Sequence, residues 1–545
     1  MTDWFSEFKK SEEYEKFLNS PVAYFCAEYA LESALPTYAG GLGVLAGDYV
    51  REAARQGFPL LAVGLNYREA QSILRGDGAA ARSKLRKVVD ERGEAVSVLL
   101  PLEERLVEIV AFEWREGDAR VYLLDTDLPG NDPIDRDITR RLYDDDRDLR
   151  LKQEIILGLG GFRMLRALGH HAGVYHLNES HSAFIALELV RHEMEHQRIA
   201  DFYQALELAR EHIVFTNHTI LPAGQELFAE DKVSLFLAQY AEEMGLTGPE
   251  ISQLGRRADL PNLLSMTALA FRLTSRVNAV SKLHAERAKA LWPEEDLNTI
   301  TNGIFVPRWD KSVGDLGSAH LRNKRKLLTL LKEKSGESWG EADLILVWAR
   351  RLVEYKQPLL LLERAEELLA LFRNSRVPVR IIFSGPTSGP ENENPYITKI
   401  KEITENKLKG FATFIPNYST EVAEVLTAGA DVWMNTPAVG FEACGTSGMK
   451  AALNGALNLS TRDGWVAEVS PEDIGWVMKD PMSSEELLAI LEKEVLPMYG
   501  GAEWQARMKR ARDLILEHFS TERMLREYIE KLYIPTLRNK HEHQA

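Results

Sequence analysis

The sequence predicts an α/β protein built from two large doubly wound halves that face a common cleft. Apolar segments typical of buried strands alternate with amphipathic helices along the whole chain. With 545 residues, the chain is too long for a single hydrophobic core. Polar loops follow several of the expected strands, and doubly wound sheets bind ligands at the carboxyl ends of their strands.

In the first half, strands and helices are expected to alternate around a glycine-rich turn. The helix after that turn should end at Gly57, because glycine commonly closes a helix in the left-handed conformation. A longer helix is predicted where apolar residues recur at helical spacing, as at Leu151, Ile155 and Leu159. The expected strands are 22–29, 60–67, 174–177 and 213–216, and the expected helices are 45–56 and 151–168.

A second α/β unit is expected to begin after residue 305. Its first strand leads into Arg350, and a helix should then continue to about Phe372. The last helices, at about 504–535, are amphipathic and are expected to cross back onto the first half. The expected strands of this unit are 344–349, 379–385, 412–415 and 431–434.

Composition and charge exclude several classes of protein. The formal net charge of −16 argues against nucleic acid or an anionic membrane as the main partner. No apolar run approaches a membrane span, and the polar N-terminus has no signal-peptide core. The two cysteines, Cys26 and Cys444, suit a reducing compartment, so we expect a cytoplasmic protein without disulfides.

The most informative segment is FEACGTSGMKAALNGALN, residues 441–458. Its small residues, Gly445 to Gly448, allow the backbone to approach an anion closely, and the helix that follows offers free N–H groups and a positive dipole end. Lys450 would lie about one turn into that helix. The segment therefore predicts a phosphate site with an amine beside it.

A second phosphate site is predicted at Arg350, Arg351 and Lys356, just past the carboxyl end of a strand. Arginine supplies a planar fork and lysine a mobile point charge, which together suit a phosphate dianion. The alternative is a solvated basic helix start. Because a helix N-terminus disfavours clustered cations, we favour phosphate binding.

Other strand ends carry weaker signals. The turn YAGGLGVLAGD, residues 38–48, makes an anion-accepting backbone, although tight turns need glycine for structural reasons alone. The polar loops LNESH (177–181), TNH (216–218) and NG (302–303) are each more often structural when taken singly. Together, they favour a polar cleft.

No metal site is expected. The triplet 144–146 is acidic but lacks the ligand spacing and the closing glutamate of a calcium loop, so it is interpreted as a turn or a rim of the cleft. The two cysteines have no histidine spacing that indicates zinc.

Taken together, these segments resemble the α-glucan phosphorylases of glycogen, starch and maltodextrin, and most closely their short bacterial and archaeal type. The resemblance covers about residues 21–535 and is highly specific at Lys450, the position of the family's pyridoxal-phosphate lysine. The motifs occur in the family's order: YFCAEYALESALPTYAGGLGVLAGD, RLKQE, HLNESHSAF, TNHTILP, TNGI, RRLVEYK and EACGTSGMKAALNGALN.

The resemblance implies a GT-B fold and reversible phosphorolysis of α-1,4-glucan, with pyridoxal phosphate as cofactor. Glucose 1-phosphate would be released with its anomeric configuration retained, and no protein carboxylate pair is needed, unlike in ordinary glycosidases. The implied partners are maltodextrin or a similar α-1,4-glucan, inorganic phosphate and glucose 1-phosphate. The family is commonly dimeric, and the regulatory extensions of its long animal members have no counterpart here. The expected domains are 1–305, 306–515 and a C-terminal helix, 516–545, that crosses back.

The resemblance also implies roles for individual residues. The catalytic residues would be Lys450, Arg351, Lys356 and His218. The cofactor would be bound by Lys450, Thr446, Ser447, Gly448, Arg350 and Tyr418. The substrates would be bound by Gly40, Gly41, Leu42, Asp146, His181, Asn302, Tyr355, Glu442, Ala443, Cys444 and Gly445.

The sequence departs from the family's pattern at three places. Ser419 stands where the family usually has an arginine that grips the cofactor phosphate, and losing one charge-assisted contact weakens binding by roughly 1.5–3 kcal/mol. Residues 68–73 read REAQSI, where the short type usually has a glycine-aromatic stretch, and Ala30 replaces a tyrosine. These differences concern acceptor preference and cofactor affinity.

Two other functions stay open at this point. A retaining GT-B transferase that uses a nucleotide sugar, such as a glycogen or starch synthase, shares the glycine turn and the Arg/Lys pair but lacks a lysine at the position of Lys450. A catalytically silent glucan-binding homologue is favoured by Ser419. The joint presence of Arg351, Lys356, His218 and Lys450 argues against it.

Overall fold

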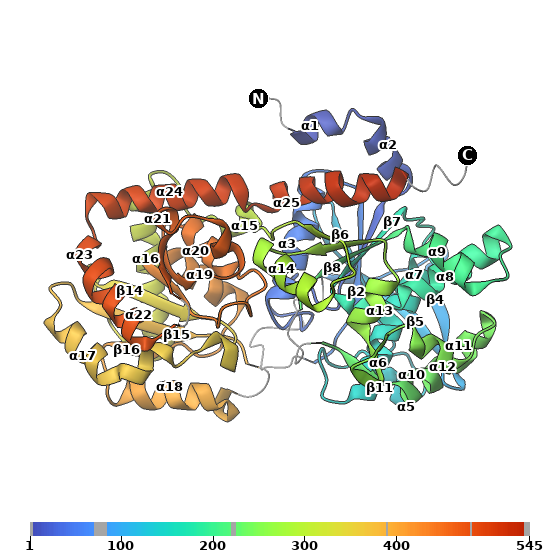
Figure 1. Cartoon of the computed structure of the whole chain (residues 1–545), viewed down its shortest axis with the longest axis horizontal. Helices are drawn as coiled ribbons and strands as arrows, with labels where there is room; N and C mark the ends of the chain where they lie inside the picture. The colour runs from blue at the N-terminus through green and yellow to red at the C-terminus, as the bar shows by residue number, and fades with distance from the viewer. Residues whose placement is uncertain (1–3, 70–83, 220–224, 388–390, 480–481, 539–545) are drawn as a thin grey trace.

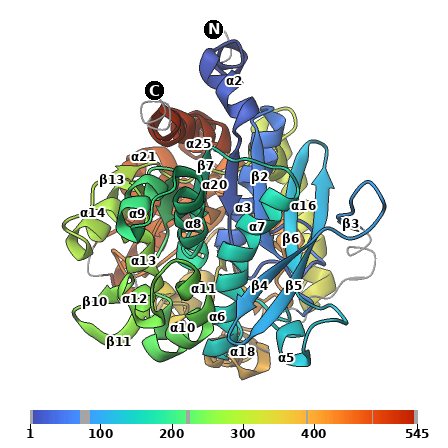
Figure 2. The same cartoon turned by 90° about the vertical axis from the view of Figure 1, so that its right-hand side faces the viewer.

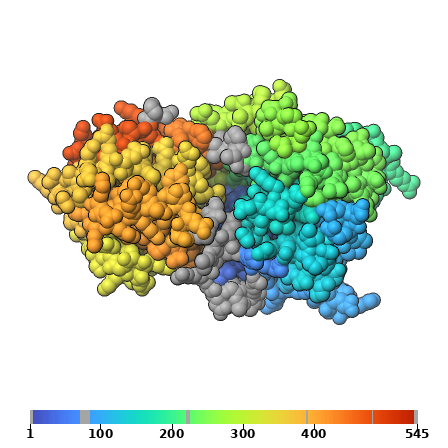
Figure 3. Space-filling model, turned by 90° about the horizontal axis from the view of Figure 1, so that it is seen from below, coloured from blue at the N-terminus to red at the C-terminus, as the bar shows by residue number. Residues whose placement is uncertain are grey.

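The computed structural model describes residues 4–69, 84–219, 225–387, 391–479 and 482–538. Two mainly parallel sheets, each with its own helices, form the two halves of the molecule (Figure 1). Figure 3 shows these halves from below, the blue-to-green first half on one side and the yellow-to-red second half on the other. The predicted α/β class is confirmed. The predictions for residues 70–73 and 220–222 lie outside the described residues.

The sheet of the first half has β1 (Val22–Phe25) at its centre. Its order is β13-β12-β8-β7-β1-β2-β6-β5-β3, with β4 beside β5, and Figure 2 shows the β3 and β13 edges on opposite sides. The strands from β13 to β6 are parallel, and β3, β4 and β5 pair antiparallel. The other strands are β2 (Leu60–Leu65), β3 (Leu85–Lys87), β4 (Ser97–Leu102), β5 (Arg105–Glu116), β6 (Ala119–Asp125), β7 (Val174–Asn178), β8 (Ile213–Asn217), β12 (Arg276–Ala279) and β13 (Leu297–Thr299), with β9 (Leu227–Ala229), β10 (Arg256–Arg257) and β11 (Leu260–Ser265) in a small antiparallel sheet.

The sheet of the second half is wholly parallel and has the order β16-β15-β14-β17-β18-β19. The strand order reverses between β14 and β17, as it does between β1 and β7 in the first half. Ligands bind at such switch points in doubly wound sheets. The strands are β14 (Leu344–Ala349), β15 (Val379–Ser384), β16 (Ala412–Phe414), β17 (Val432–Asn435), β18 (Leu457–Thr461) and β19 (Gly475–Met478).

Helices pack around both sheets and bury their apolar faces in them. No helix among the described residues is both long and apolar enough to cross a membrane. In the first half the helices are α1 (Trp4–Phe8), α2 (Glu12–Asn19), α3 (Gly41–Arg55), α5 (Pro133–Arg136), α6 (Arg147–Ile155), α7 (Gly161–Ala167), α8 (Ile185–Gln197), α9 (Phe202–Arg210), α10 (Glu230–Phe236), α11 (Ala238–Glu243), α12 (Gly248–Gln253), α13 (Met266–Arg272) and α14 (Lys282–Leu291). The helices after residue 305 are α15 (Val306–Trp309), α16 (Leu316–Ser335), α17 (Ala365–Asn374), α18 (Pro395–Glu405), α19 (Thr420–Gly429), α20 (Ser447–Leu453), α21 (Pro471–Ile474), α22 (Ser484–Ile490), α23 (Leu496–Met498), α24 (Ala502–His518) and α25 (Thr521–Tyr528).

The last two helices run end to end along one edge of the molecule and connect its halves (Figure 1). Met508 of α24 packs in the core of the second sheet, whereas Leu525 and Tyr528 of α25 pack with Tyr24 and Tyr49 of the first half. The Tyr49 hydroxyl lies 2.6 Å from that of Tyr533. The C-terminal segment therefore holds the two halves together.

Three element predictions were wrong in detail. The helix expected to start at about Leu45 begins at Gly41, so residues 41–48 of the predicted glycine-rich turn are helical. The first strand ends at Phe25 because the backbone of Tyr29 and Ala30 bonds instead to Thr37 and Gly43, 2.7 and 2.8 Å away. The helix expected to continue to Phe372 is broken into two 3₁₀ turns before α17. Pro358 lacks a backbone donor, and Gln357 before it adopts a left-handed conformation (φ 50°). Gly57 does close α3 at φ 61°, as predicted.

Candidate active site

A pocket of about 380 Å³ is lined by both halves of the molecule. It collects the glycine turn before α3, the loops after β8 and β13, and the strand ends and helix starts of the second sheet. The pocket brings together these residues predicted from the sequence: Gly40, Gly41, Leu42, His218, Asn302, Arg350, Arg351, Tyr355, Lys356, Tyr418, Glu442, Ala443, Cys444, Gly445, Thr446, Ser447 and Lys450.

The glycine turn lies against a guanidinium group of the second half. A Cβ atom on Gly40 would lie 2.7 Å from Nη2 of Arg351, whereas one on Gly41 would meet no atom within 4 Å. The buried carboxylate of Glu28 accepts hydrogen bonds from the backbone N–H groups of Ala39 (2.8 Å) and Gly40 (3.0 Å). Glu28 therefore holds the turn in the conformation that lets Arg351 approach.

Three charged side chains form a buried ionic cluster on the pocket wall. The Glu442 carboxylate contacts the Lys356 ammonium group and lies 3.1 Å from Nη1 of Arg350. Burial lowers the pKa of Lys356 to about 8, although Glu442 opposes the change. Burial resists ionisation of Glu442, but the two cations outweigh it and lower the pKa of this carboxyl. One acid and two bases leave the cluster with a surplus positive charge.

Asp463, just after β18, fixes the loop that carries Glu442. Its Oδ2 atom accepts hydrogen bonds from the backbone N–H groups of Gly440 (2.8 Å), Phe441 (3.1 Å) and Glu442 (2.9 Å). Burial raises the pKa of Asp463 to about 6. Among the residues that the structure describes, none accepts a hydrogen bond from the backbone N–H groups of 443–445, which leaves these donors available to a ligand.

The start of α20 combines free backbone groups with an amine. Gly445 adopts a left-handed conformation (φ 78°), which favours glycine, and the helix begins at Ser447. The Ser447 hydroxyl accepts a hydrogen bond of 3.0 Å from Arg350. Burial lowers the pKa of Lys450 to about 8, and its Nζ atom lies 3.8 Å from the centroid of the Trp309 ring. This amine therefore loses its proton at a lower pH than a solvated lysine does.

The side of the pocket that carries His218 and Asn302 is polar and held by hydrogen bonds. Nε2 of His218 lies 2.7 Å from Oδ1 of Asn178, and Glu179 accepts hydrogen bonds from the His218 backbone (3.1 Å) and the Thr219 hydroxyl (2.9 Å). Burial lowers the pKa of His218 to about 3, so this imidazole is neutral at pH 7. Oδ1 of Asn302 is buried without a partner among the described residues. Both side chains can therefore bond to hydroxyl groups of a ligand.

The pocket fits a cofactor that bears both a phosphate and an amine-reactive group. Nε of Arg350 is buried without a hydrogen-bond partner among the described residues, beside the start of α20. A Cβ atom on Gly448 would lie 2.5 Å from Oδ1 of Asn458, so this turn has no room for a side chain. Ser419, at the position of the family's arginine, caps α19 by accepting a hydrogen bond of 3.3 Å from Val422. The adjacent Tyr418 is partly buried, and desolvation raises its pKa to about 12.

Three predicted site residues lie outside the pocket lining. Gly448 is buried against Asn458 and Trp465. The Asp146 carboxylate caps α6, accepting hydrogen bonds from the backbone of Asp148 (2.9 Å) and Leu149 (3.3 Å). His181 lines a separate, smaller cavity together with Tyr143 and Glu154.

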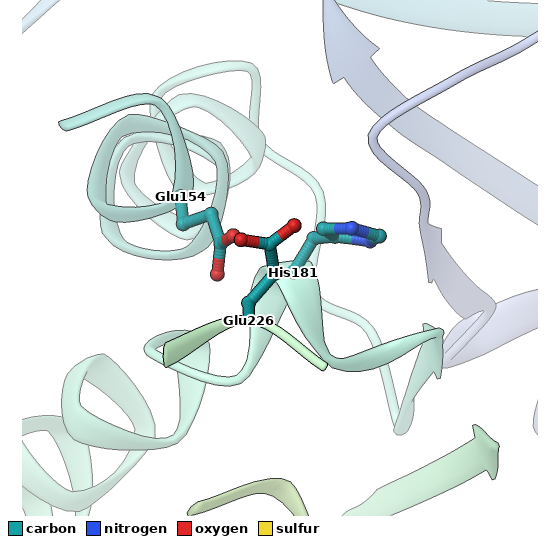
Figure 4. Close-up of side chains that lie close together, drawn as sticks. All are labelled: Glu154, His181 and Glu226. Carbon is teal, nitrogen blue, oxygen red and sulfur yellow. The ribbon is translucent and has the colours of Figure 1, made fainter. Parts of the chain in front are cut away.

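His181 belongs to a buried cluster with Glu154 and Glu226, whose carboxylates approach one another (Figure 4). The Glu226 carboxylate already contacts Arg150 and lies 3.3 Å from Arg147. Burial strongly raises the pKa of Glu154. The two arginines already supply more positive charge than the Glu226 carboxylate needs, so the charge of the cluster gives no support for a metal site.

The carboxylates of Glu28, Asp48 and Asp463 are structural parts of this site that the sequence motifs did not reveal. Glu28 and Asp48 lie inside the quoted segment 24–48, and Asp463 follows the segment 441–458. Each bonds to groups elsewhere along the chain; Asp463 and Glu442, for example, are 21 residues apart. The only available sequence signal was the turn-forming Asp-Gly pair at Asp463.

Comparisons with known proteins agree with this geometry. A family model described as carbohydrate phosphorylase matches residues 310–532. The maltodextrin phosphorylase of Thermococcus litoralis is 36% identical over 98% of this chain and 72% of its own length. The glycogen phosphorylase of Aquifex aeolicus is 30% identical over 96% of this chain and 88% of its own length. An uncharacterised protein of Methanocaldococcus jannaschii is 31% identical, covering 94% of this chain and 99% of its own length.

Proposed function

The chain belongs to the carbohydrate phosphorylase family, and we propose that it catalyses reversible phosphorolysis of α-1,4-glucan, such as maltodextrin, to glucose 1-phosphate. One observation carries the proposal. Arg350, Arg351 and Lys356 share a single pocket with the buried amine of Lys450. A nucleotide-sugar transferase has no need for that amine.

The proposed architecture is a GT-B fold with two Rossmann-like domains, 1–305 and 306–515, and a C-terminal helix, 516–545, that crosses back. Two parallel sheets whose strand orders reverse next to the pocket support it. The packing of Leu525 and Tyr528 in the first half supports the crossing helix. A reducing compartment, the cytoplasm, is in keeping with Cys26 and Cys444, which are both buried and unpaired.

Arg351 and Lys356 are proposed to bind the substrate phosphate, together with the backbone at Gly41. The guanidinium group supplies two parallel donors, and the ammonium group adds a point charge. In the free protein, Glu442 pairs with both Lys356 and Arg350 and offsets one of their two positive charges. Phosphate binding would therefore compete with Glu442 for these cations, which frees the carboxylate to accept a sugar hydroxyl.

The sugar would be bound by His218, Asn302 and Glu442, with Tyr355 as a wall and the backbone N–H groups of 443–445 as further donors. The neutral imidazole of His218 donates its Nε2–H to Oδ1 of Asn178, so its Nδ1 atom can accept a hydrogen bond from a sugar hydroxyl without adding charge. Asp146 and His181 are proposed to act from the periphery of the site. Cations fixed near the reacting bond would stabilise negative charge that develops on phosphate.

The residues present fit pyridoxal phosphate. Lys450 would hold its aldehyde carbon, and Thr446, Ser447, Gly448 and Arg350 would hold its phosphate beside Tyr418. When bound, the cofactor supplies an acidic phosphate group next to the substrate phosphate. Ser419 contributes a helix cap where the family has an arginine, so Arg350 would carry most of the positive charge at this phosphate.

Replacing Lys450 with alanine tests the function. The variant should lose phosphate-dependent release of glucose 1-phosphate from maltodextrin and the absorption band of bound pyridoxal phosphate. Lys334→Ala, which removes an exposed lysine of α16, is the matched control and should keep both. Retained turnover in Lys450→Ala would refute the proposed role, and turnover that requires a nucleotide sugar would indicate a synthase.

A further inference from the structure

The tryptophan that contacts Lys450 is also hydrogen-bonded to a buried carboxylate. Trp309 Nε1 donates a hydrogen bond of 2.6 Å to Oδ2 of Asp48. The Lys450 Nζ atom lies 3.8 Å from the centroid of the same ring. Asp48 and Trp309 are 1% exposed and Lys450 is 8% exposed, so water screens little of their interaction. The three residues form a continuous chain from carboxylate through indole to amine.

Three further charged side chains, Arg308, Glu424 and Lys311, are linked to Asp48 by ion pairs. Arg308 lies 3.2 Å from both Oδ1 of Asp48 and Oε1 of Glu424. Its guanidinium carbon is 5.0 Å from the Trp309 ring centroid. Lys311 neutralises the other oxygen of Glu424 at 3.0 Å. The Asp48 and Glu424 carboxylates thus fix Arg308, and Asp48 fixes the indole.

We propose that Asp48 is a positioning residue which, through Trp309, sets the place and the protonation of the Lys450 amine. The inference rests on the proposed function, because it concerns the residue that would hold the cofactor. It assigns a role to a residue that never reaches the pocket surface. Asp48 is absent from the pocket lining, whereas Trp309 and Lys450 are both part of it.

Burial and the nearby carboxylates act in opposite directions on the pKa of Lys450. Burial favours the neutral amine, Arg308 acts in the same direction, and Asp48 and Glu424 favour the ammonium form. A hydrogen bond from the indole N–H to a carboxylate increases the electron density of the ring, and a ring face attracts a cation. Asp48 therefore supports the ammonium form both directly and through Trp309, and it prevents the ring from rotating away.

The arrangement also links the amine to the contact between the halves. Asp48 lies on α3 of the first half, Trp309 on α15 and Lys450 on α20 of the second half. Tyr38 and Thr420 make a second bridge nearby, with their hydroxyls 3.2 Å apart. A change in the distance between the halves would therefore change the environment of the amine.

The test measures the protonation of Lys450 without any turnover. The full chain, prepared free of cofactor, is labelled with trace acetic anhydride between pH 6 and pH 10. Mass spectrometry of the peptide that contains Lys450 then gives the midpoint of its labelling. Wild type should show a midpoint of about 8. Asp48→Asn and Trp309→Phe should both lower it, and a fall of about half a unit makes the neutral fraction at pH 7 roughly threefold larger.

Two controls separate positioning from folding. Asp315→Asn makes the same chemical change at the N-cap of α16, where asparagine caps equally well, and should keep the wild-type midpoint. Trp309→Phe keeps an aromatic ring but has no N–H group to donate to Asp48. It therefore tests the chain of contacts even where Asp48→Asn does not fold.

An unchanged midpoint in every folded variant of Asp48 and Trp309 would overturn the proposal. A midpoint lowered in Trp309→Phe but not in folded Asp48→Asn would also overturn it, because the carboxylate would then be irrelevant. If the labelling midpoints of the Asp48 and Trp309 variants fall as expected but the wild-type protein shows no phosphorolysis, only the proposed function is contradicted. If the wild-type protein catalyses phosphorolysis but the variants keep the wild-type labelling midpoint, only this inference is contradicted.

Discussion

Replacing Glu442 with glutamine should make the free protein bind inorganic phosphate more tightly. The carboxylate contacts Lys356 and lies 3.1 Å from Arg350, where a phosphate group is expected to bind. Glutamine keeps the size and the hydrogen-bonding capacity of the side chain but removes the charge. The two buried cations then lack their counter-charge, and a phosphate dianion can supply it.

The magnitude follows from the burial of the cluster. The three side chains are between 6% and 10% exposed, so their charges are poorly screened. Removing one partner of a buried ion pair costs about 3–5 kcal/mol of stability. If phosphate recovers one charge-assisted contact of about 1.5–3 kcal/mol, its affinity for the variant rises about 10- to 100-fold.

Isothermal titration calorimetry of phosphate into the free protein, at pH 7 and fixed ionic strength, measures this change. In wild type Lys356 is mostly protonated there, because its pKa is about 8 and Glu442 favours its ammonium form. Removing Glu442 lowers this pKa, so the variant's lysine takes up a proton when phosphate binds. In thermal denaturation, the midpoint of Glu442→Gln should be lower than that of wild type, and added phosphate should largely restore it. Glu341→Gln, which breaks an exposed pair with Arg325 at 2.8 Å, should change neither result.

The same variant should turn over glucan more slowly, because it weakens a proposed contact to the sugar. The reasoning is refuted if Glu442→Gln binds phosphate no more tightly than wild type at equal ionic strength. That result would mean that the anion binds elsewhere in the pocket.

Three further predictions concern the same pocket. Gly40→Ala places a Cβ atom 2.7 Å from the Arg351 guanidinium group and should raise the KM for phosphate roughly tenfold, whereas Gly41→Ala, with nothing within 4 Å, should leave it unchanged. Phosphate affinity should fall as pH rises above about 8, where Lys356 loses its proton, and Lys356→Arg should remove this dependence in a pH series of KM values. Ser419→Arg and Ser419→Ala both lose the cap of α19, at a cost of about 1 kcal/mol in thermal denaturation. Only the arginine variant should retain pyridoxal phosphate longer than wild type during dialysis, and equal retention would contradict a role for charge at this position.

Sequence motifs predicted the pocket well where chemistry and backbone shape coincide. The run from Gly445 to Lys450 needs a left-handed glycine and a helix start, and both occur there. Arg350 and Arg351 directly follow a buried strand, so their position at a sheet edge could be deduced from periodicity. The separate halves were predictable from length and from the alternation of strands and helices.

Long-range carboxylates were not predictable in the same way. Glu28, Asp48 and Asp463 look like ordinary acidic residues in the sequence, because their partners are brought close only by folding. Asp146 shows the opposite case. Its carboxylate caps the helix that begins at the next residue. Aspartate is a common N-cap residue, so this structural role could have been predicted from the local sequence.

Local backbone chemistry also limited the prediction of elements. The segment after Arg351 has the apolar spacing of a helix, but Pro358 removes a donor and Gln357 leaves the right-handed region. The first strand is shorter than its apolar run because the glycine turn competes for the backbone groups of Tyr29 and Ala30. In both places, a tertiary or conformational constraint outweighed the pattern of hydrophobicity.

The most direct test of the proposed function is an assay of the purified full chain, reconstituted with pyridoxal phosphate and supplied with maltodextrin. The proposal predicts glucose 1-phosphate in amounts that depend on added inorganic phosphate, and its loss in Lys450→Ala. Absence of glucose 1-phosphate at every phosphate concentration, from protein that shows the cofactor's absorption band, would contradict it.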